Sequence, residues 1–389
     1  MPPSTRVKVL ESITDVPKAA WNALVPEGAP PVLRWEWIAA MEESGSAVRE
    51  RGWEAAHLTL WREGTLVAAA PAWRKYHSMG EYVYDFGWAN AAQQLGVRYY
   101  PKLLVGVPLS PLTARRFLCL PGEDESSTRN ELLAAARDFA KETDCSSVHV
   151  LFPPEAEAQA LEAAGMFRRA TLQYHWQNPG YATWDDFLAR FDAKRRHQLK
   201  RERGAAKQQG ISLRTVRSHE LDESHAELAW RFYDATASRY SWGPVQLTRG
   251  LFTRAFAALP DAIELVLAER RGKVIAGAFN LHTPTHLYGR YWGCFEEHPF
   301  LHFHVCLYHS IDDCIRLGRR VFEPGAGGEH KISRGFQPTR IHSAHWIFDA
   351  RLEAAVKDFC RREAVQVQHL ADDGERISGL KPWPLPAKS

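Results

Sequence analysis

A glycine-rich turn late in the chain places three chemically active side chains next to one another. Residues 322–331 read FEPGAGGEHK, so Glu329, His330 and Lys331 follow three glycines. Glycines let a backbone approach a ligand closely. A carboxylate or a neutral imidazole can take the proton of an amine, while Lys331 or Arg334 can face a developing oxyanion. The pattern predicts acyl transfer to an amine at Glu329, His330, Lys331 and Arg334. The structural alternative is a helix N-cap with a surface ion pair.

Two segments just before this turn supply aromatic and charged side chains. Residues 288–293 (YGRYWG) end a predicted strand, and residues 299–304 (PFLHFH) open a predicted helix. In open α/β units the loops at the carboxyl ends of strands form the ligand crevice. We therefore predict that the substrate contacts Arg290, Tyr291, Trp292, His302 and Glu323.

A second aromatic group lies in the first half of the chain. Residues 84–89 (YDFGWA) and 98–103 (RYYPKL) place aromatic rings around an acid and a lysine. This composition suits an acceptor pocket at a domain interface, formed by Asp85, Trp88, Tyr100 and Lys102. Buried tyrosines with satisfied hydroxyl groups are the alternative explanation.

A basic helical segment is the third candidate. Seven basic residues and one acid, Glu202, lie within residues 194–207. Steps of four, three and four residues place four cations on one helical face, where they repel each other unless an anion is bound. We predict a phosphate or tRNA site at Lys194, Arg196, Lys200, Arg203 and Lys207; a solvated helix face is the alternative. The R-x-x-G-x-A match at 201–206 lies inside the predicted helix, where its amides are already bonded.

Metal and hydrolase chemistry are disfavoured by motif and spacing. Seven histidines lie between His298 and His345, but His302 and His304 are poorly spaced for one helix face, and no H-E-x-x-H or G-x-S-x-G motif is present. None of the six cysteines forms a C-x-x-C pair. We predict no metal and no cofactor other than the acyl donor.

The elements that must position these residues occur twice. Residues 57–70 and 264–278 both alternate apolar and polar residues around a charged-plus-Gly corner, which is a β-hairpin signature. Each is followed by a helical stretch and a strand, at 131–152 and 303–323. This order predicts tandem copies of one α/β unit with a mixed sheet. A turn at 178–180 places the boundaries at 1–178 and 179–376, with a proline-containing tail at 377–389.

Further helices are predicted at 184–209, 219–240, 248–259 and 350–370, with Thr183 and Asp349 as N-caps. The composition is that of a globular protein: 389 residues, 45% hydrophobic, 24% charged and a net charge of +3. The sequence lacks an apolar run near 18 residues and an apolar stretch at its start. We therefore expect a cytoplasmic protein without a spanning segment.

Taken together, several stretches resemble the FemAB-like family of predicted N-acyltransferases, which is related to Fem-type aminoacyltransferases and, more distantly, to the GNAT superfamily. The resemblance covers residues 35–371 and rests on residues 53–73, 82–85, 99–103, 149–153, 194–200, 287–294, 299–304, 325–336 and 343–346. It implies two tandem GNAT-like domains and transfer of an acyl or aminoacyl group to an amine, as Fem-type enzymes do from aminoacyl-tRNA.

We therefore expect a cytoplasmic N-acyltransferase that moves an aminoacyl group from aminoacyl-tRNA to the amine of a small molecule or a cell-wall precursor. An acyl-CoA donor is one alternative, because no heptad-patterned arm of the Fem type is present. The other is a non-catalytic module that binds tRNA or a cell-wall precursor. Turnover that releases free tRNA or CoA separates a catalyst from a binding module.

Overall fold

The computed structural model describes residues 5–239 and 245–384, and the chain divides into two compact units. Unit 1 comprises Met1–Thr171, Gln246–Leu251 and Arg340–Val367, and unit 2 comprises Leu172–Val245, Phe252–Thr339 and Gln368–Ser389. Four elements have residues in both units: β9 (Phe167–Gln177), α9 (Arg249–Ala258), β15 (Gln337–Ile347) and α12 (Ala350–Ser378).

Unit 1 contains a four-stranded sheet in the order β1-β3-β4-β7 and a second sheet in the order β15-β8-β6-β5-β2. Helix α4 packs Leu132, Leu133 and Ala136 against apolar residues of both sheets. The bounds are β1 (Thr5–Leu10), α1 (Lys18–Asn22), α2 (Trp35–Glu43), β2 (Trp53–Ala55), β3 (His57–Arg62), β4 (Thr65–Ala70), β5 (Ala72–Lys75), α3 (Phe86–Gln94), β6 (Lys102–Val105), β7 (Leu118–Cys119), α4 (Glu125–Glu142), β8 (Ser147–Leu151) and α5 (Glu155–Ala163).

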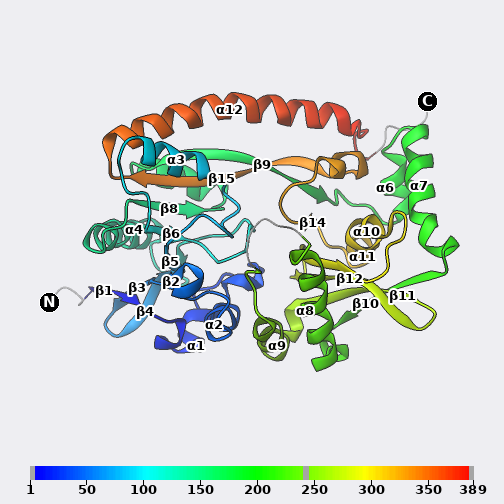
Figure 1. The fold of residues 1–389 in the computed structure, drawn as a ribbon, viewed down its shortest axis with the longest axis horizontal. Helices are drawn as coiled ribbons and strands as arrows, with labels where there is room; N and C mark the ends of the chain where they lie inside the picture. The colour runs from blue at the N-terminus through cyan, green and yellow to red at the C-terminus, as the bar shows by residue number, and fades with distance from the viewer. Residues whose placement is uncertain (1–4, 240–244, 385–389) are drawn as a thin grey trace. The chain divides into compact units, whose positions relative to one another are not determined.

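Unit 2 is built on the strand order β10-β11-β12-β13-β14, followed by the end of β9. Strands β10, β11, β12 and β14 are labelled in Figure 1. Its remaining helices and strands are α6 (Trp184–Ala189), α7 (Ala193–Gln208), β10 (Ile211–Arg217), α8 (Glu223–Ala237), β11 (Ile263–Arg270), β12 (Lys273–His282), β13 (His286–Cys294), α10 (Leu301–Phe303), a π-helical turn η6 (His304–Tyr308), α11 (His309–Arg316), β14 (Val321–Glu323) and a 3₁₀ helix η7 (Glu329–Arg334).

The two predicted hairpins are confirmed, and they share their turn chemistry. β3 and β4 are joined by Glu63 and Gly64, with φ of 51° and 82°, while β11 and β12 are joined by Arg271 and Gly272, with φ of 50° and 73°. Positive φ at both central residues defines a type I′ turn, which matches the twist of the flanking strands. Each hairpin also has a register shift at the same distance from its turn.

The second half of the predicted repeat is confirmed as well. In unit 1 helix α4 leads to β8, which pairs in parallel with β6, and in unit 2 helix α11 leads to β14, which pairs in parallel with β13. Each unit therefore combines an antiparallel hairpin with one parallel strand pair. A crossover helix is the connection that parallel neighbours require.

The division into units differs from the predicted contiguous boundary at 178/179. The chain returns to unit 1 at Arg340, because β15 pairs antiparallel with β8, with Ser343 opposite Leu151. The predicted tail begins inside α12, which ends at Ser378, and Trp383 then packs against Tyr181 with ring centroids 5.2 Å apart. Residues 385–389 of that tail lie outside the described residues.

The long helical region predicted over 184–209 is helical but interrupted, because the chain forms two helices there, α6 and α7. Thr183 caps α6 as expected, but Asp192 starts a new helix by accepting a hydrogen bond from the Arg195 amide at 2.7 Å. A side chain that caps a helix competes with continuation of the preceding one.

The predicted helices at 219–240 and 248–259 are confirmed within their bounds as α8 and α9; Tyr240 lies outside the described residues. Helix α12 runs eight residues past its predicted end at Leu370.

The Asp349 cap of α12 is confirmed, since its carboxylate accepts from the amides of Arg351 and Leu352 at 2.9 and 3.1 Å. Across residues 5–239 and 245–384, no helix combines the length and the apolarity needed to cross a membrane.

Helix α8 lies so close to β13 that a side chain cannot fit at Gly293. A Cβ there would be 2.3 Å from the backbone of Phe232. We expect Gly293→Ala to destabilise unit 2 by about 3 kcal/mol, because the backbone of α8 would have to shift. Gly204→Ala is the control: its Cβ meets nothing within 4 Å in the middle of α7, so it should be neutral or stabilise by up to about 1 kcal/mol. Urea unfolding measures both; equal effects would contradict the close packing.

Candidate active site

The parallel strands β13 and β14 separate after a short pairing, and this separation creates the candidate site. Only three residue pairs connect them, from His286 with Val321 to Tyr288 with Glu323. β13 continues to Cys294 along β12, whereas the other chain turns away at Pro324. Gly289 lies where the two chains begin to separate, since a Cβ there would be 3.2 Å from Pro324 Cα. Beyond Gly289, the edge of β13 faces a cavity.

The cavity has a volume of about 250 Å³ and lies entirely within unit 2. Strands β12 and β13 form one wall, the π-helical turn η6 contributes Cys306 and Leu307, and the glycine-rich turn closes the opposite side. π-helical turns occur frequently at functional sites. The lining residues include six of the predicted site residues: Arg290, Tyr291, Trp292, His302, His330 and Lys331.

The glycine-rich turn holds the ammonium group of Lys331. Lys331 Nζ donates to the carbonyl oxygens of Gly327 at 2.7 Å and Gly325 at 2.9 Å, and it lies 3.5 Å from that of Pro324. Gly325, Gly327 and Gly328 have φ of 87°, 75° and 92°, which other residues rarely adopt. The glycines therefore fold the turn so that its carbonyl groups converge on one cation.

Lys331 is a buried cation with no carboxylate partner among the described residues. Burial lowers its pKa from the usual 10.5 to about 8. The buried Arg334 and Lys102, by contrast, each form ion pairs with carboxylates. A buried charge without a counter-charge is costly. Because Lys331 lines the cavity, an anion that forms or binds there would supply the missing charge.

Two imidazoles face the same cavity as neutral groups. Burial lowers the pKa of His302 to about 4, and partial desolvation together with the charges of Lys331 and Arg334 lowers that of His330 below its usual value. Their ring centroids are 6.2 Å apart, and His302 also packs on Trp292 at 4.6 Å. His330 is exposed at the cavity rim. A neutral imidazole in this position can accept a proton from an amine.

Three further predicted residues lie outside the cavity lining: Glu329 and Arg334, predicted to be catalytic, and Glu323, predicted to contact the substrate. Glu329 is exposed, and Glu323 is buried at the end of β14. Arg334 is buried; its guanidinium lies 3.5 Å from the ring centroid of Phe303 and forms an ion pair with Glu202 at 2.8 Å. Arg334 therefore contacts the residues that follow the glycine-rich turn without lining the cavity, whereas His330 and Lys331 line it.

The predicted basic face of α7 is only partly open to an anion. Arg203 forms an ion pair with Asp312 at 2.5 Å and lies over the Trp184 ring, while Arg196 donates to the Phe191 carbonyl. The most exposed cations of this helix are Lys194, Lys200, Arg201 and Lys207. These four side chains are the most accessible to a phosphate backbone, and of them Lys200 lies 4.0 Å from the Asp185 carboxylate.

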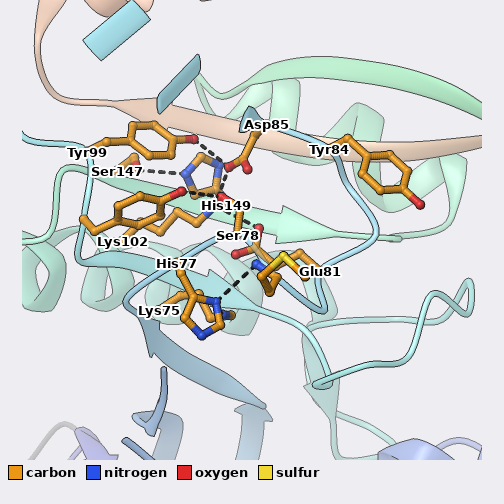
Figure 2. Close-up of polar contacts among 12 residues, drawn as sticks. Lys75, His77, Ser78, Glu81, Tyr84, Asp85, Tyr99, Lys102, Ser147 and His149 are labelled. Carbon is orange, nitrogen blue, oxygen red and sulfur yellow. Dashed lines mark hydrogen bonds and ion pairs between the residues drawn. The ribbon is translucent and has the colours of Figure 1, made fainter. Parts of the chain in front are cut away.

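The predicted group in the first half of the chain forms a buried polar cluster inside unit 1 (Figure 2). Lys102 is fully buried and forms ion pairs with Glu81, at 2.8 Å, and with Asp85. Tyr99 donates to Asp85 at 2.7 Å, and the Tyr100 hydroxyl is 2.7 Å from that of Ser78. Tyr84 points away from the cluster into solvent (Figure 2). Asp85 and Lys102 are thus paired inside the fold, whereas Asp85 Oδ1 and Glu81 Oε1 are buried without a hydrogen-bond partner among the described residues.

Lys75 adds a second buried ammonium group directly opposite Lys102. The two lysines are register partners on β5 and β6, so they share one face of the sheet. Lys75 Nζ lies 2.7 Å from His77 Nδ1 and 4.3 Å from the centroid of the Trp53 ring. Burial lowers the pKa of Lys75 to about 7 and raises that of Glu81 to about 7. For Lys102 the two carboxylates outweigh burial and raise the pKa above its usual value.

A chain of hydrogen bonds continues this polar face across β8 and β15. The Nδ1 atoms of His149 and His345 are 2.6 Å apart, and the Nε2 atoms contact Ser147 and Ser343 at 2.7 and 2.8 Å. Burial holds both pKa values well below the usual value, so both rings are neutral. Trp88 packs on His345 with centroids 4.8 Å apart.

Sequence reasoning missed several of these residues. Trp73 and Lys75 are two residues apart on β5, so their side chains point to the same face of the sheet. Because Trp73 is a large apolar residue, this spacing could have indicated that Lys75 is buried. Glu81 and Glu202 carry no such signal, because their partners are 21 and 132 residues away. Among the described residues, no group of His, Cys, Asp and Glu side chains could hold a metal ion.

The chain belongs to the FemAB-like family, described as acting in peptidoglycan biosynthesis or recognition, whose model matches residues 12–381. Of the solved structures, FemX superposes with a TM-score of 0.53 at 12% identity, covering 88% of this chain and 98% of FemX. The C-terminal domain of a protein named as a lysylphosphatidylglycerol synthetase, from Agrobacterium fabrum, gives 0.51 at 10% identity, covering 88% and 95%. No curated protein sequence matches the chain.

These findings confirm the predicted family, and the structure confirms the predicted fold class, a mixed α/β chain with the same hairpin, helix and parallel strand pair in each unit. A tandem GNAT protein from the clavulanic acid biosynthesis pathway also matches, with a TM-score of 0.45 at 13% identity, covering 88% of this chain and 98% of its own. At these identities the structural likeness establishes the fold, and family membership supports an acyltransferase in peptidoglycan biosynthesis or recognition.

The two lysines of the unit 1 cluster should respond in opposite ways to removal of their charge. Lys102→Met leaves Glu81 and Asp85 without their cation, so we expect a loss of about 3–5 kcal/mol. Lys75→Met removes an ammonium group that forms no ion pair within residues 5–239 and 245–384, so we expect it to be neutral or stabilising by about 1–4 kcal/mol. Guanidinium unfolding of both variants is the measurement.

The pH dependence follows from the pKa of Lys75, which is about 7 instead of 10.5. Burial penalises only the protonated amine, so the penalty is complete below pH 7 and fades as the pH rises toward 10.5. The advantage of Lys75→Met should therefore be larger at pH 6 than at pH 10. An advantage that grows with pH would contradict the assignment.

Proposed function

We propose that this FemAB-like protein is an N-acyltransferase that uses aminoacyl-tRNA to acylate the amine of a small molecule or a peptidoglycan precursor in the cytoplasm. The observation that carries the proposal is Lys331, a buried ammonium group at the wall of a cavity, to which none of the described carboxylates is paired. Such a cation is suited to a transition state in which negative charge develops on oxygen.

The reaction proceeds by attack of the acceptor amine on the ester carbonyl carbon of the donor. A C–N bond forms, and the carbonyl oxygen becomes an oxyanion that the Lys331 ammonium stabilises. The contact from Lys331 Nζ to Pro324 O is the longest of its three, at 3.5 Å, and the oxyanion replaces it. His330 accepts the amine proton and returns it to the departing ribose oxygen as the C–O bond breaks, which leaves an amide and free tRNA.

The exposed edge of β13 and the aromatic wall supply the binding surface for the donor or acceptor. Trp292 and His302 pack edge to face beside Tyr291 and Arg290, all of them lining the cavity. On helix α7, Lys194, Lys200, Arg201 and Lys207 present cations to solvent within the same unit. This arrangement suits a donor that carries a polyanion outside the cavity and a small acyl group inside it.

Lys331→Met should lower kcat about 10²- to 10³-fold, because the oxyanion loses its charged donor. The measurement is release of free tRNA or CoA from labelled donor pools in the presence of candidate amines. Lys273→Met is the control, since Lys273 is exposed in the β11–β12 hairpin.

The pKa of Lys331 is about 8, so the rate of the native protein should fall as the pH rises through 8, because the ammonium group loses its proton. Full turnover by Lys331→Met would exclude this role.

The donor is tested by the salt dependence of binding. Replacing Lys200 and Lys207 by Ala should reduce the slope of log K against log salt by about 0.7–0.9 for each phosphate that the variant no longer neutralises. The control is Lys273→Ala, which leaves α7 intact. Coenzyme A is titrated in parallel. Binding of CoA together with indifference to tRNA would overturn the aminoacyl-tRNA donor in favour of acyl-CoA.

A further inference from the structure

Helix α7 carries one acid among seven basic residues, and that acid faces inward. Glu202 is 2% exposed and shares the buried face of the helix with Leu199 and Ala206. Burial opposes ionisation of Glu202, but hydrogen bonds from Tyr308 and Gln198 and the charge of Arg334 keep its pKa below the usual value. Glu202 is therefore a buried carboxylate anion.

The Glu202 carboxylate accepts hydrogen bonds from one residue of its own helix, from the π-helical turn η6 and from the 3₁₀ helix η7. Its Oε2 atom accepts from Arg334 Nη2 at 2.8 Å and from the Tyr308 hydroxyl, while Gln198 donates to Oε1 at 2.8 Å. Arg334 Nε in turn donates to the Tyr308 hydroxyl at 2.8 Å. These bonds connect α7, the π-helical turn η6 and the 3₁₀ helix η7.

Arg334 connects this hydrogen-bond network to the residues that line the cavity. Its Nη1 atom donates to the carbonyl oxygen of His330 at 2.9 Å, and its guanidinium lies over the Phe303 ring. His330 and Lys331 are adjacent and both line the cavity. The position of Arg334 thus fixes the peptide from which the imidazole and the ammonium group of the site project.

We propose that Glu202 is a positioning residue, which holds Arg334 so that His330 and Lys331 keep their orientation toward the cavity. The inference deepens the proposed function and rests on it for the catalytic role of Lys331. It also gives helix α7 two faces with separate tasks: exposed cations on one side and the support of the glycine-rich turn on the other.

Stability alone does not account for this network. Replacing a buried ion pair by apolar residues of similar volume is often neutral or stabilising, so such a pair is weak evidence for stability. An apolar pair could fill the same space between α7 and η7. It could not donate a hydrogen bond to the His330 carbonyl, which is the contact that reaches the site.

The experiment compares the full-length protein with its Glu202→Gln variant, in which the shape of the side chain is kept and its charge is removed. Lys331 is labelled with trace acetic anhydride, and its acetylation rate is read by peptide mass spectrometry against the other lysines. We expect the pH-independent rate constant of the free amine of Lys331, taken from the pH profile of labelling, to rise at least about threefold, because the turn no longer holds the side chain in its buried position. Where turnover is established, kcat should fall by about 10- to 100-fold with little change in KM.

The matched control is Glu363→Gln, which breaks a largely buried Arg–Glu pair with Arg169 in unit 1, joined by bonds of 2.6 and 2.7 Å. It should lower the thermal midpoint comparably and leave the labelling of Lys331 unchanged. An unchanged rate in Glu202→Gln, or an equal rise in Glu363→Gln, would overturn the positioning role. The labelling readout needs no substrate, so failure of the proposed function would appear separately, as full turnover by Lys331→Met.

Discussion

The pairing of β13 with β14 ends after three residues, and the candidate site depends on that ending. A parallel pair that continued would satisfy the β13 edge with backbone hydrogen bonds and leave no space for a ligand. Instead Pro324, which has no amide hydrogen to donate, follows the last paired residue of β14 and begins the glycine-rich turn. The turn then directs its carbonyl groups back toward Lys331. The segment from Pro324 to Lys331 therefore both ends the pairing of β13 with β14 and holds the Lys331 ammonium group.

The same topology in unit 1 ends differently. There the parallel pair is β6 with β8, and side chains of unit 1 donate hydrogen bonds to the backbone carbonyl groups at the ends of these strands. Trp73 Nε1 donates to the Gly106 carbonyl at 3.1 Å, and the buried Arg116 donates to the Leu151 carbonyl at 2.5 Å. Two units with the same hairpin, crossover helix and parallel pair thus differ in whether side chains fill the end of that pair. This difference favours unit 2 as the place of the chemistry.

How much the sequence could predict depends on the range of the interactions. Type I′ turns are encoded by two adjacent residues, so the hairpins at Gly64 and Gly272 were predictable, as was the Asp349 cap. The break at Asp192 was missed because a capping side chain inside a helical pattern looks like a polar surface residue. The return of β15 to β8 and the pairing of Glu202 with Arg334 were not predictable, because each joins residues more than 130 positions apart.

Three buried lysines show why the residues alone could not assign the site. Lys102 lies between two carboxylates, Lys75 lies against an aromatic ring and an imidazole, and Lys331 lies among backbone carbonyl groups. The side chain is the same in each case, and its chemistry is set by the groups that the fold brings within hydrogen-bonding distance. Carboxylates make Lys102 a permanent structural cation. The carbonyl groups around Lys331 orient its charge without neutralising it, and Lys331 also lines a cavity. Those two conditions together distinguish a cation available to a reacting oxygen from one already used by the fold.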